Sequence, residues 1–218
     1  MTTRVLLVDD HPIVQRGLRV TLDAEPDLRV VAVAGSGEAA LAALDTAAPD
    51  VALVDVSLPG MNGVELVRHL LARRPALRVL VVSRHDAELY AERAVRAGAR
   101  GFLSKLEAAE RVVDAVRAVR DGRLYLDDAT KDRLVLGAPL SEPDPLAQLS
   151  DRELQVYEAL GHGCSTREIA DALALSVKTV ETYRTRVRDK LGLGSSRALL
   201  QHATRWAADH GADGAPER

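Results

Sequence analysis

Residues 4–12 read RVLLVDDHP, a short apolar run that ends in two aspartates and a proline. Pro12 suits the first turn of a helix, where its missing N–H would have no partner. Amphipathic stretches with helical spacing separate this run from four similar ones, at Leu28–Ala34, Val51–Asp55, Arg78–Ser83 and Gly101–Leu103. Alternating buried strands and helices predict an α/β doubly wound fold with a five-stranded parallel sheet.

The length and composition fit two soluble globular domains. The chain has 218 residues, of which 47% are hydrophobic and 28% are charged, and domains usually have about 100–150 residues. Its one cysteine, Cys164, excludes an intramolecular disulfide. No apolar run reaches the roughly 18 residues of a membrane span. We therefore expect a cytoplasmic protein without a membrane partner.

Charged and hydroxyl side chains stand at the carboxyl ends of the predicted strands. Asp9 and Asp10 follow the first strand, Asp55 ends the third, Ser83 ends the fourth and Lys105 follows the fifth. Functional groups of doubly wound sheets gather at this edge. Three carboxylates placed together repel one another unless they share a hard divalent cation, of which Mg²⁺ is the natural choice. The ammonium and the hydroxyl would then bind oxygens of a phosphoryl group on one carboxylate.

Four motifs resemble the receiver domain of bacterial two-component response regulators. They are LVDDH at 7–11, VDVSLPGMNG at 54–63, VS at 82–83 and FLSK at 102–105. The resemblance covers residues 1–126 and implies that Asp55 accepts a phosphoryl group from a sensor histidine kinase. It also implies a Mg²⁺ site formed by Asp10, Asp55 and the backbone carbonyl of Ser57, with Asp9 holding a metal-bound water. Lys105 would pair with the phosphate.

The same resemblance implies roles for four residues around the phosphoacceptor. Ser83 would shift to hydrogen-bond a phosphate oxygen, and Phe102 would change its rotamer in step. Ser57 and His85 lie two residues beyond Asp55 and Ser83, where the family tunes the lifetime of the phosphoryl group. The protein would not be an enzyme, apart from the part that the receiver takes in its own phosphorylation and slow dephosphorylation.

A linker and a helical domain follow the receiver-like part. Residues 127–148 lose the helical period and contain three prolines, so we interpret them as a linker. Ser150 with Glu153 and Ser165 with Glu168 have the spacing of capping boxes, in which each side chain satisfies an unpaired helix N–H group. We expect four helices at about 150–161, 166–173, 177–191 and 196–208, with residues 209–218 as a tail.

The third of these helices has a basic outer face. Residues 176–206 contain seven basic and two acidic side chains. The second and third expected helices together read as a helix-turn-helix. LSDRE at 149–153, LSVKTVETY at 175–183 and KLG at 190–192 resemble the LuxR-type DNA-binding domain across residues 149–208. The whole chain thus resembles response regulators of the NarL/FixJ class.

This second resemblance implies how the protein contacts double-stranded DNA. The third helix would enter the major groove. Lys178, Glu181, Thr182 and Thr185 would face bases, and Tyr183, Arg184, Arg186 and Arg188 would contact phosphates. Glu181 stands where some members have lysine, and a carboxylate can accept a hydrogen bond from the N4 amino group of cytosine.

The last helix resembles the surface through which such domains dimerise on two half-sites of DNA. It carries Leu199, Leu200, Ala203 and Trp206. The alternative is a helix that packs onto its own domain. The expected function is a phosphorylation-controlled transcription regulator: phosphorylation of Asp55 switches the receiver, and a homodimer binds a two-fold operator.

Three other interpretations remain open on the sequence alone. One is a regulator that binds DNA constitutively and uses its receiver only to dimerise. Another is an NAD-sensing regulator, because Gly35 and Gly37 open a helix after a strand and Asp55 follows Gly35 by twenty positions. The last is a phosphatase that forms an aspartyl phosphate, although Ser57 stands where such an enzyme needs a general acid.

Overall fold

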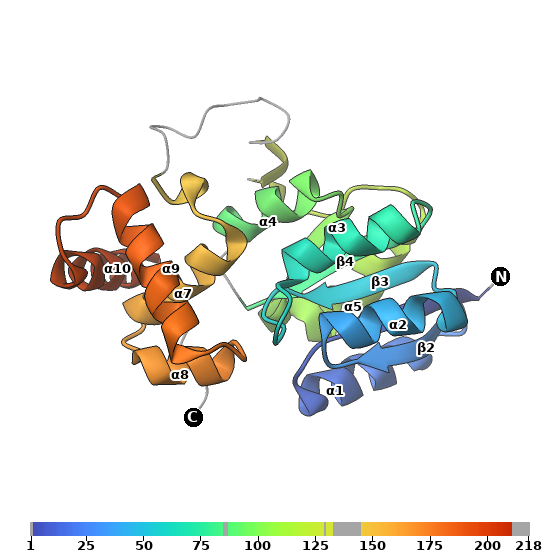
Figure 1. The fold of residues 1–218 in the computed structure, drawn as a ribbon. Coiled ribbons are helices and arrows are strands. Elements are labelled where there is room, and N and C mark those ends of the chain that lie inside the picture. The colour runs from blue at the N-terminus through green and yellow to red at the C-terminus, as the bar shows by residue number, and fades with distance from the viewer. Residues whose placement is uncertain (1, 85–86, 129, 133–144, 211–218) are drawn as a thin grey trace. The chain divides into compact units, whose positions relative to one another are not determined.

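The computed structural model describes residues 2–84, 87–128, 130–132 and 145–210. The chain divides into two compact units, residues 1–136 and 137–218 (Figure 1). No helix among the described residues has both the length and the apolar character needed to cross a membrane.

The first unit contains a five-stranded parallel sheet, as predicted. Its strands are β1 (Thr3–Val8), β2 (Leu28–Ala34), β3 (Val51–Asp55), β4 (Arg78–Ser83) and β5 (Gly101–Ser104), in the spatial order β2-β1-β3-β4-β5. β1 begins one residue earlier and β5 ends one residue later than expected. The strand order reverses between β1 and β3, and open sheets of this kind bind their ligands at the carboxyl ends of the strands at such a point.

Helices cover both faces of the sheet. α1 and α5 pack against each other on one face, and α2, α3 and α4 follow one another on the other (Figure 1). Apolar side chains of the strands, such as Leu7 and Leu53, form a core cluster with Leu22 of α1 and Val116 of α5. This packing holds the strands in place, and the functional side chains lie at their carboxyl ends. The helices are α1 (Pro12–Asp23), α2 (Gly37–Ala47), α3 (Gly63–Arg73), α4 (Ala87–Arg96) and α5 (Lys105–Arg120).

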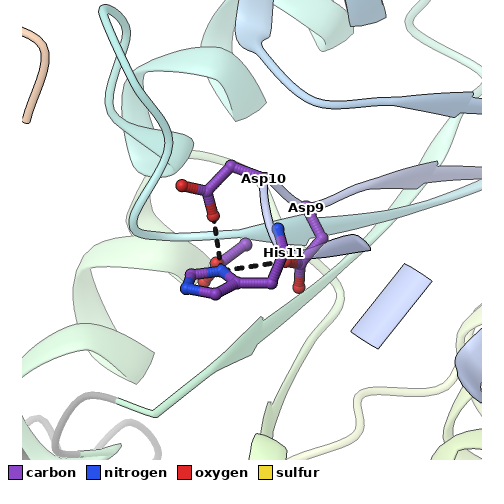
Figure 2. Close-up of side chains that lie close together, drawn as sticks. Asp9, Asp10 and His11 are labelled. Atoms are coloured by element: carbon purple, nitrogen blue, oxygen red, sulfur yellow. Dashed lines mark hydrogen bonds and ion pairs between the residues drawn. The ribbon is translucent and has the colours of Figure 1, made fainter. Parts of the chain in front are cut away.

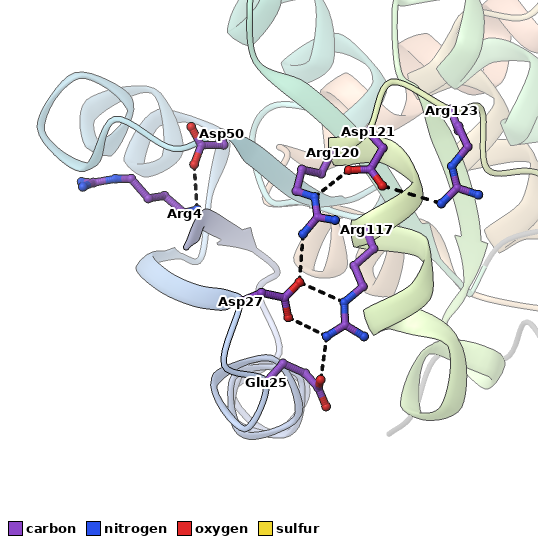
Figure 3. Close-up of polar contacts among 8 residues, drawn as sticks. All are labelled: Arg4, Glu25, Asp27, Asp50, Arg117, Arg120, Asp121 and Arg123. Carbon is purple, nitrogen blue, oxygen red and sulfur yellow. Dashed lines mark hydrogen bonds and ion pairs between the residues drawn. The ribbon is translucent and has the colours of Figure 1, made fainter. Parts of the chain in front are cut away.

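Ion pairs fasten α5 to the turn before β2 (Figure 3). The guanidinium of Arg117 contacts both carboxylate oxygens of Asp27 and reaches Oε2 of Glu25 at 2.7 Å. Arg120 Nη1 lies 2.9 Å from Asp27 Oδ2. The hydrogen bonds from Arg117, followed by those from Arg120, hold the pKa of Asp27 well below its ordinary range. This cluster joins residues about ninety positions apart in the chain.

Replacing Arg117 with glutamine is expected to lower the melting temperature of the first unit at neutral pH. The depressed pKa means that charged Asp27 stabilises the fold above about pH 4, and that this contribution is lost as the pH falls further. The difference from wild type should therefore narrow below pH 4 in thermal unfolding followed by circular dichroism. Arg111→Gln removes one exposed pair with Glu107 on the same helix and should change little; equal losses in both variants would contradict the prediction.

The second unit is helical, and both predicted capping boxes are confirmed. Ser150 Oγ accepts from the Glu153 N–H, and Glu153 Oε2 accepts from the Ser150 N–H at 2.8 Å. Ser165 and Glu168 repeat this arrangement. The elements are the 3₁₀ helix η1 (Pro145–Gln148), α7 (Asp151–Gly161), α8 (Thr166–Ala172), α9 (Val177–Lys190) and α10 (Ser196–His210).

Regular structure occurs within both the predicted linker and the predicted tail. η1 falls in the predicted linker, yet Gln148 Nε2 donates to the Lys190 carbonyl at 2.7 Å and Lys190 Nζ donates to the Gln148 carbonyl at 3.0 Å. These contacts join the end of the linker to the end of α9. A helical turn also begins at Asp128, capped by Asp127. α10 continues to His210, two residues past the expected end.

The last helix packs largely onto its own unit. Leu199 and Ala203 are buried, and Trp206 lies beside the ring of Tyr157 on α7, with the ring centroids 5.6 Å apart. Leu200 is exposed. Leu199 and Ala203 therefore belong to the core of this unit, as in the alternative of a helix packed onto its own domain, because α10 needs its apolar stripe to complete the core of a small domain.

Candidate functional site

Two carboxylates follow β1, next to the point where the strand order reverses. Asp9 is buried, with 2% of its surface exposed, and its Oδ1 accepts the backbone N–H of His11 at 2.8 Å. Gln15, one helical turn into α1, donates to the Asp9 carbonyl. Asp10 is half-buried, and its Oδ1 lies 2.6 Å from His11 Nδ1 (Figure 2). The turn from β1 into α1 thus presents both acidic side chains at one edge of the sheet.

Asp55 ends β3, and a close backbone approach shapes the loop that follows it. Its Oδ1 accepts the N–H of Ser57 at 3.2 Å. The N–H of Gly63, the first residue of α3, donates to the Val56 carbonyl at 2.9 Å. A Cβ added at Gly63 would lie 1.9 Å from the Asp55 carbonyl oxygen. Only glycine leaves room for the loop to return this close to the strand.

Replacing Gly63 with alanine is expected to destabilise the first unit by about 2 kcal/mol, because the new methyl group meets backbone that has to shift. The shift would also displace Asp55. Gly17→Ala is the matched control: a Cβ at this position on α1 would have open space within 4 Å, and alanine favours a helix over glycine. Urea unfolding of the two variants measures the difference, and equal stability would contradict this prediction.

Lys105 brings the ends of three strands together. As the first residue of α5, it places Nζ 2.6 Å from Asp9 Oδ2 and 2.7 Å from Asp55 Oδ2. All three side chains are buried, with side-chain exposures of 8%, 3% and 3%. Burial lowers the lysine pKa, but the charges of Asp55 and Asp9 outweigh it, so the pKa of Lys105 is raised. Lys105 is therefore an ammonium at neutral pH.

The acidic cluster suits a divalent cation. Asp9, Asp10, Asp55 and His11 offer ligand atoms that all lie within 4.8 Å of one another. Three carboxylates and one ammonium leave two negative charges, which a divalent cation would balance. Asp10 Oδ1 is shielded from solvent, and its close contact with His11 Nδ1 lacks hydrogen-bond geometry. Burial raises the pKa of Asp55, and Asp9 adds to this effect against the opposing charge of Lys105.

Three further predicted receiver residues lie in the described part of the first unit. Ser83 and Phe102 are buried, and Ser57 is half-buried beside Asp55. His85 lies outside the described residues. Sequence reasoning assigned no role to His11 or Gln15, although both contact Asp9. Their spacing of four residues at the start of a helix was the available signal.

The glycines that suggested a dinucleotide site lie after β2, at the edge of the sheet. The strand order reverses elsewhere, between β1 and β3, so this loop is not at the crevice that binds nucleotides in such folds. Ser36 caps α2, and a Cβ at Gly37 would lie 3.0 Å from the Cβ of Met61. The glycines therefore serve a tight turn and the contact with the loop after β3.

The predicted DNA-contacting residues lie on α9, the second helix of a helix-turn-helix. Val180 and Val187 are buried, so the opposite face of the helix points outward. Three of the eight are half-buried: Arg184 contacts Thr166 and Glu181, Arg188 contacts Asp189, and the third is Tyr183. The other five are exposed, namely Lys178, Glu181, Thr182, Thr185 and Arg186.

Comparison with known proteins gives matches in both units. The family model of the response regulator receiver domain matches residues 5–117, and that of the bacterial regulatory proteins of the luxR family matches residues 147–203. The chain is 40% identical over 192 residues to the DNA-binding transcriptional activator DevR/DosR of Mycobacterium tuberculosis, covering 87% of this chain and 88% of that protein. It is 40% identical over 197 residues to the transcriptional regulatory protein UhpA of Escherichia coli, covering 90% and 95%.

Solved structures agree with this assignment. The RcsB response regulator of Salmonella typhimurium matches with a TM-score of 0.66 at 26% identity, over 94% of this chain and 98% of that one. A LuxR-family two-component response regulator from Aurantimonas matches with a TM-score of 0.58 at 32% identity, over 63% and 98%. With its receiver sheet, its strand-end carboxylates and its helix-turn-helix unit, the chain belongs to the two-component response regulators of the NarL/FixJ class, which join a receiver domain to a LuxR-type DNA-binding domain.

Proposed function

We propose that this protein is a transcription regulator switched by phosphorylation of Asp55. The observation that carries the proposal is the bridge from the Lys105 ammonium to Asp9 and Asp55 at the carboxyl ends of the strands. It supports a buried carboxylate placed as an acceptor, with a cation ready to receive the phosphoryl oxygens. The relatives DevR/DosR and UhpA are transcriptional regulators. The only reactions that we assign to the protein are its own phosphorylation and its slow dephosphorylation.

The proposed transfer is an in-line displacement. A carboxylate oxygen of Asp55 forms a bond to the phosphorus of a phosphohistidine on the sensor kinase. The P–N bond breaks, and the histidine nitrogen keeps its electron pair. Asp10, Asp55 and the Ser57 carbonyl would hold Mg²⁺, with Asp9 acting through a bound water, and the cation would neutralise charge on the phosphoryl oxygens. Lys105 pairs with the phosphate in this scheme.

The remaining receiver residues tune the switch in this proposal. Ser83 and Phe102 change position with phosphorylation, whereas Ser57 and His85 set the lifetime of the phosphoryl group. We assign residues 1–126 to the receiver, 127–148 to the linker, 149–208 to DNA binding and 209–218 to a tail.

Phosphorylation then favours a homodimer that binds a two-fold operator. In this proposal α9 enters the major groove of double-stranded DNA, and the exposed Leu200 on α10 contributes to the dimer surface. DevR/DosR is described as a DNA-binding transcriptional activator, which supports the DNA partner. The protein acts in the cytoplasm, where it meets the kinase and the chromosome.

The test combines protein mass with DNA affinity. The full chain is incubated with a small-molecule phosphodonor with and without Mg²⁺, and its intact mass is measured. Both forms are then titrated against DNA duplexes selected from a random pool. We expect a Mg²⁺-dependent phosphoryl adduct and tighter binding by the phosphorylated form. An adduct without a gain in affinity would favour constitutive DNA binding with a receiver used only to dimerise.

Alanine at both Arg186 and Arg188 is expected to weaken binding to all duplexes and to reduce the slope of log affinity against log salt by about two, since two phosphate contacts would be lost. The control removes two exposed arginines from the first unit, Arg73 and Arg96. This control should leave the slope unchanged. Titrations at four salt concentrations measure both slopes, and an unchanged slope in the α9 variant would argue against this helix as the DNA contact.

A further inference from the structure

The carboxylate of Glu181 is held by two partners on the outer face of α9. Thr166, the first residue of α8, donates from Oγ1 to Glu181 Oε1 at 3.1 Å. Arg184, one turn further along α9, donates from Nη1 to the same oxygen at 3.0 Å and also to Thr166 Oγ1. Three side chains from both helices of the helix-turn-helix therefore meet at one carboxylate oxygen.

This arrangement leaves the second oxygen, Oε2, without a polar partner in the part of the chain that the structure describes. The Glu181 side chain is 55% exposed, whereas the Arg184 side chain is 24% exposed. The carboxylate is thus fixed at one oxygen, while more than half of the side-chain surface is open to solvent. Side-chain freedom that would otherwise be lost on binding is already restricted in the free protein.

Arg184 is better placed to orient Glu181 than to reach a DNA phosphate. Its Nη1 already makes two hydrogen bonds, and its Nε is buried without a hydrogen-bond partner among the described residues. Moving the guanidinium outward would break both contacts. Its positive charge also offsets the repulsion between the Glu181 carboxylate and the phosphates of a bound duplex.

Two neighbouring hydroxyls add to the same chemical character. Thr182 Oγ1 donates to the Lys178 carbonyl at 2.9 Å, and Thr185 Oγ1 donates to the Glu181 carbonyl at 3.0 Å. Because each hydroxyl proton is used within the helix, lone pairs and methyl groups remain to face outward. This part of α9 therefore presents acceptors, which match amino groups on base edges.

Cytosine fits this set of acceptors better than adenine does. In the major groove its edge presents the N4 amino donor, whereas adenine places the N7 acceptor beside its N6 donor, where it would repel a carboxylate. We propose that Glu181 reads a cytosine amino group in each half-site, and that Thr166 and Arg184 are positioning residues for this contact. The inference rests on the proposed function, since it requires that α9 enters the major groove.

The test measures base preference separately from overall affinity. Full-length protein, treated with phosphodonor and Mg²⁺, selects duplexes from a pool with a 20-base-pair random segment, and the bound duplexes are sequenced. Wild type should enrich a C·G pair at one position of each half-site. Glu181→Ala should lose about tenfold of the preference for cytosine there, the cost of one mismatched contact. Thr166→Val and Arg184→Met should also weaken this preference, and Thr166→Ser, which keeps the hydroxyl, should retain it.

The salt dependence of binding distinguishes the two roles of arginine. Arg184→Met should change base preference and leave the salt slope within half a unit of wild type, whereas Arg188→Ala, the control, should lower the slope by about one and leave base preference unchanged. If wild type and Glu181→Ala select the same motif, or if Arg184→Met alters only the slope, the inference is wrong and the proposed function stands. If wild type retains no duplex, both are wrong.

Discussion

Asp55→Asn is expected to accept no phosphoryl group under conditions in which wild type is modified. An amide nitrogen and a neutral carbonyl oxygen cannot replace the carboxylate nucleophile, whose Oδ2 lies 2.7 Å from the Lys105 ammonium. The variant should therefore show no mass increase after incubation with phosphodonor and Mg²⁺, and its DNA affinity should stay at the unphosphorylated level. Intact mass spectrometry followed by a binding titration measures both effects.

Two controls separate lost chemistry from lost structure. Asp45→Asn makes the same change at an exposed position on α2 and should be phosphorylated like wild type. Burial raises the pKa of Asp55, so its ionised form costs stability at pH above its ordinary pKa. The asparagine variant should thus be at least as stable as wild type in buffer without divalent cations. A phosphoryl adduct on Asp55→Asn would place the acceptor at another residue.

Lys105→Met is expected to destabilise the first unit by about 3 kcal/mol at pH 7 without divalent cations. The substitution keeps an apolar stem of similar length but leaves Asp9 and Asp55 buried beside each other without a counter-charge, and breaking a buried ion pair costs about 3–5 kcal/mol. Phosphorylation should also slow strongly, because the cation that would meet the phosphoryl oxygens is lost. Hydrogen exchange of β1 and β3 amides during urea titration reports the stability of this unit alone.

Lys131→Met is the matched control for this prediction, since Lys131 pairs with Asp128, whose side chain is highly exposed. It should cost less than about 1 kcal/mol. Lowering the pH should narrow the deficit of Lys105→Met, because protonation of the buried carboxylates removes their mutual repulsion. A loss no greater than that of the control would show that the Lys105 bridge contributes little to stability.

Local features of both units could be predicted closely from the chain alone. The ends of β2, β3 and β4 lie at the predicted residues, and the capping boxes at Ser150 and Ser165 form as expected. Buried parallel strands show continuous apolar runs, and a capping box joins residues only three positions apart. The site carboxylates could be identified because Asp9 follows such a strand and Asp55 ends one.

The set of elements, the motifs at the strand ends and the family resemblance therefore all follow from local patterns in the chain. Contacts between distant side chains depend on the folded arrangement. Lys105 contacts both Asp9 and Asp55, whereas Arg184, expected at a phosphate, contacts Thr166 and Glu181. The difference lies in how far apart in the sequence the interacting residues are. Periodicity and capping depend on neighbours within a few residues, but these contacts join positions brought together by the order of strands and the crossing of helices.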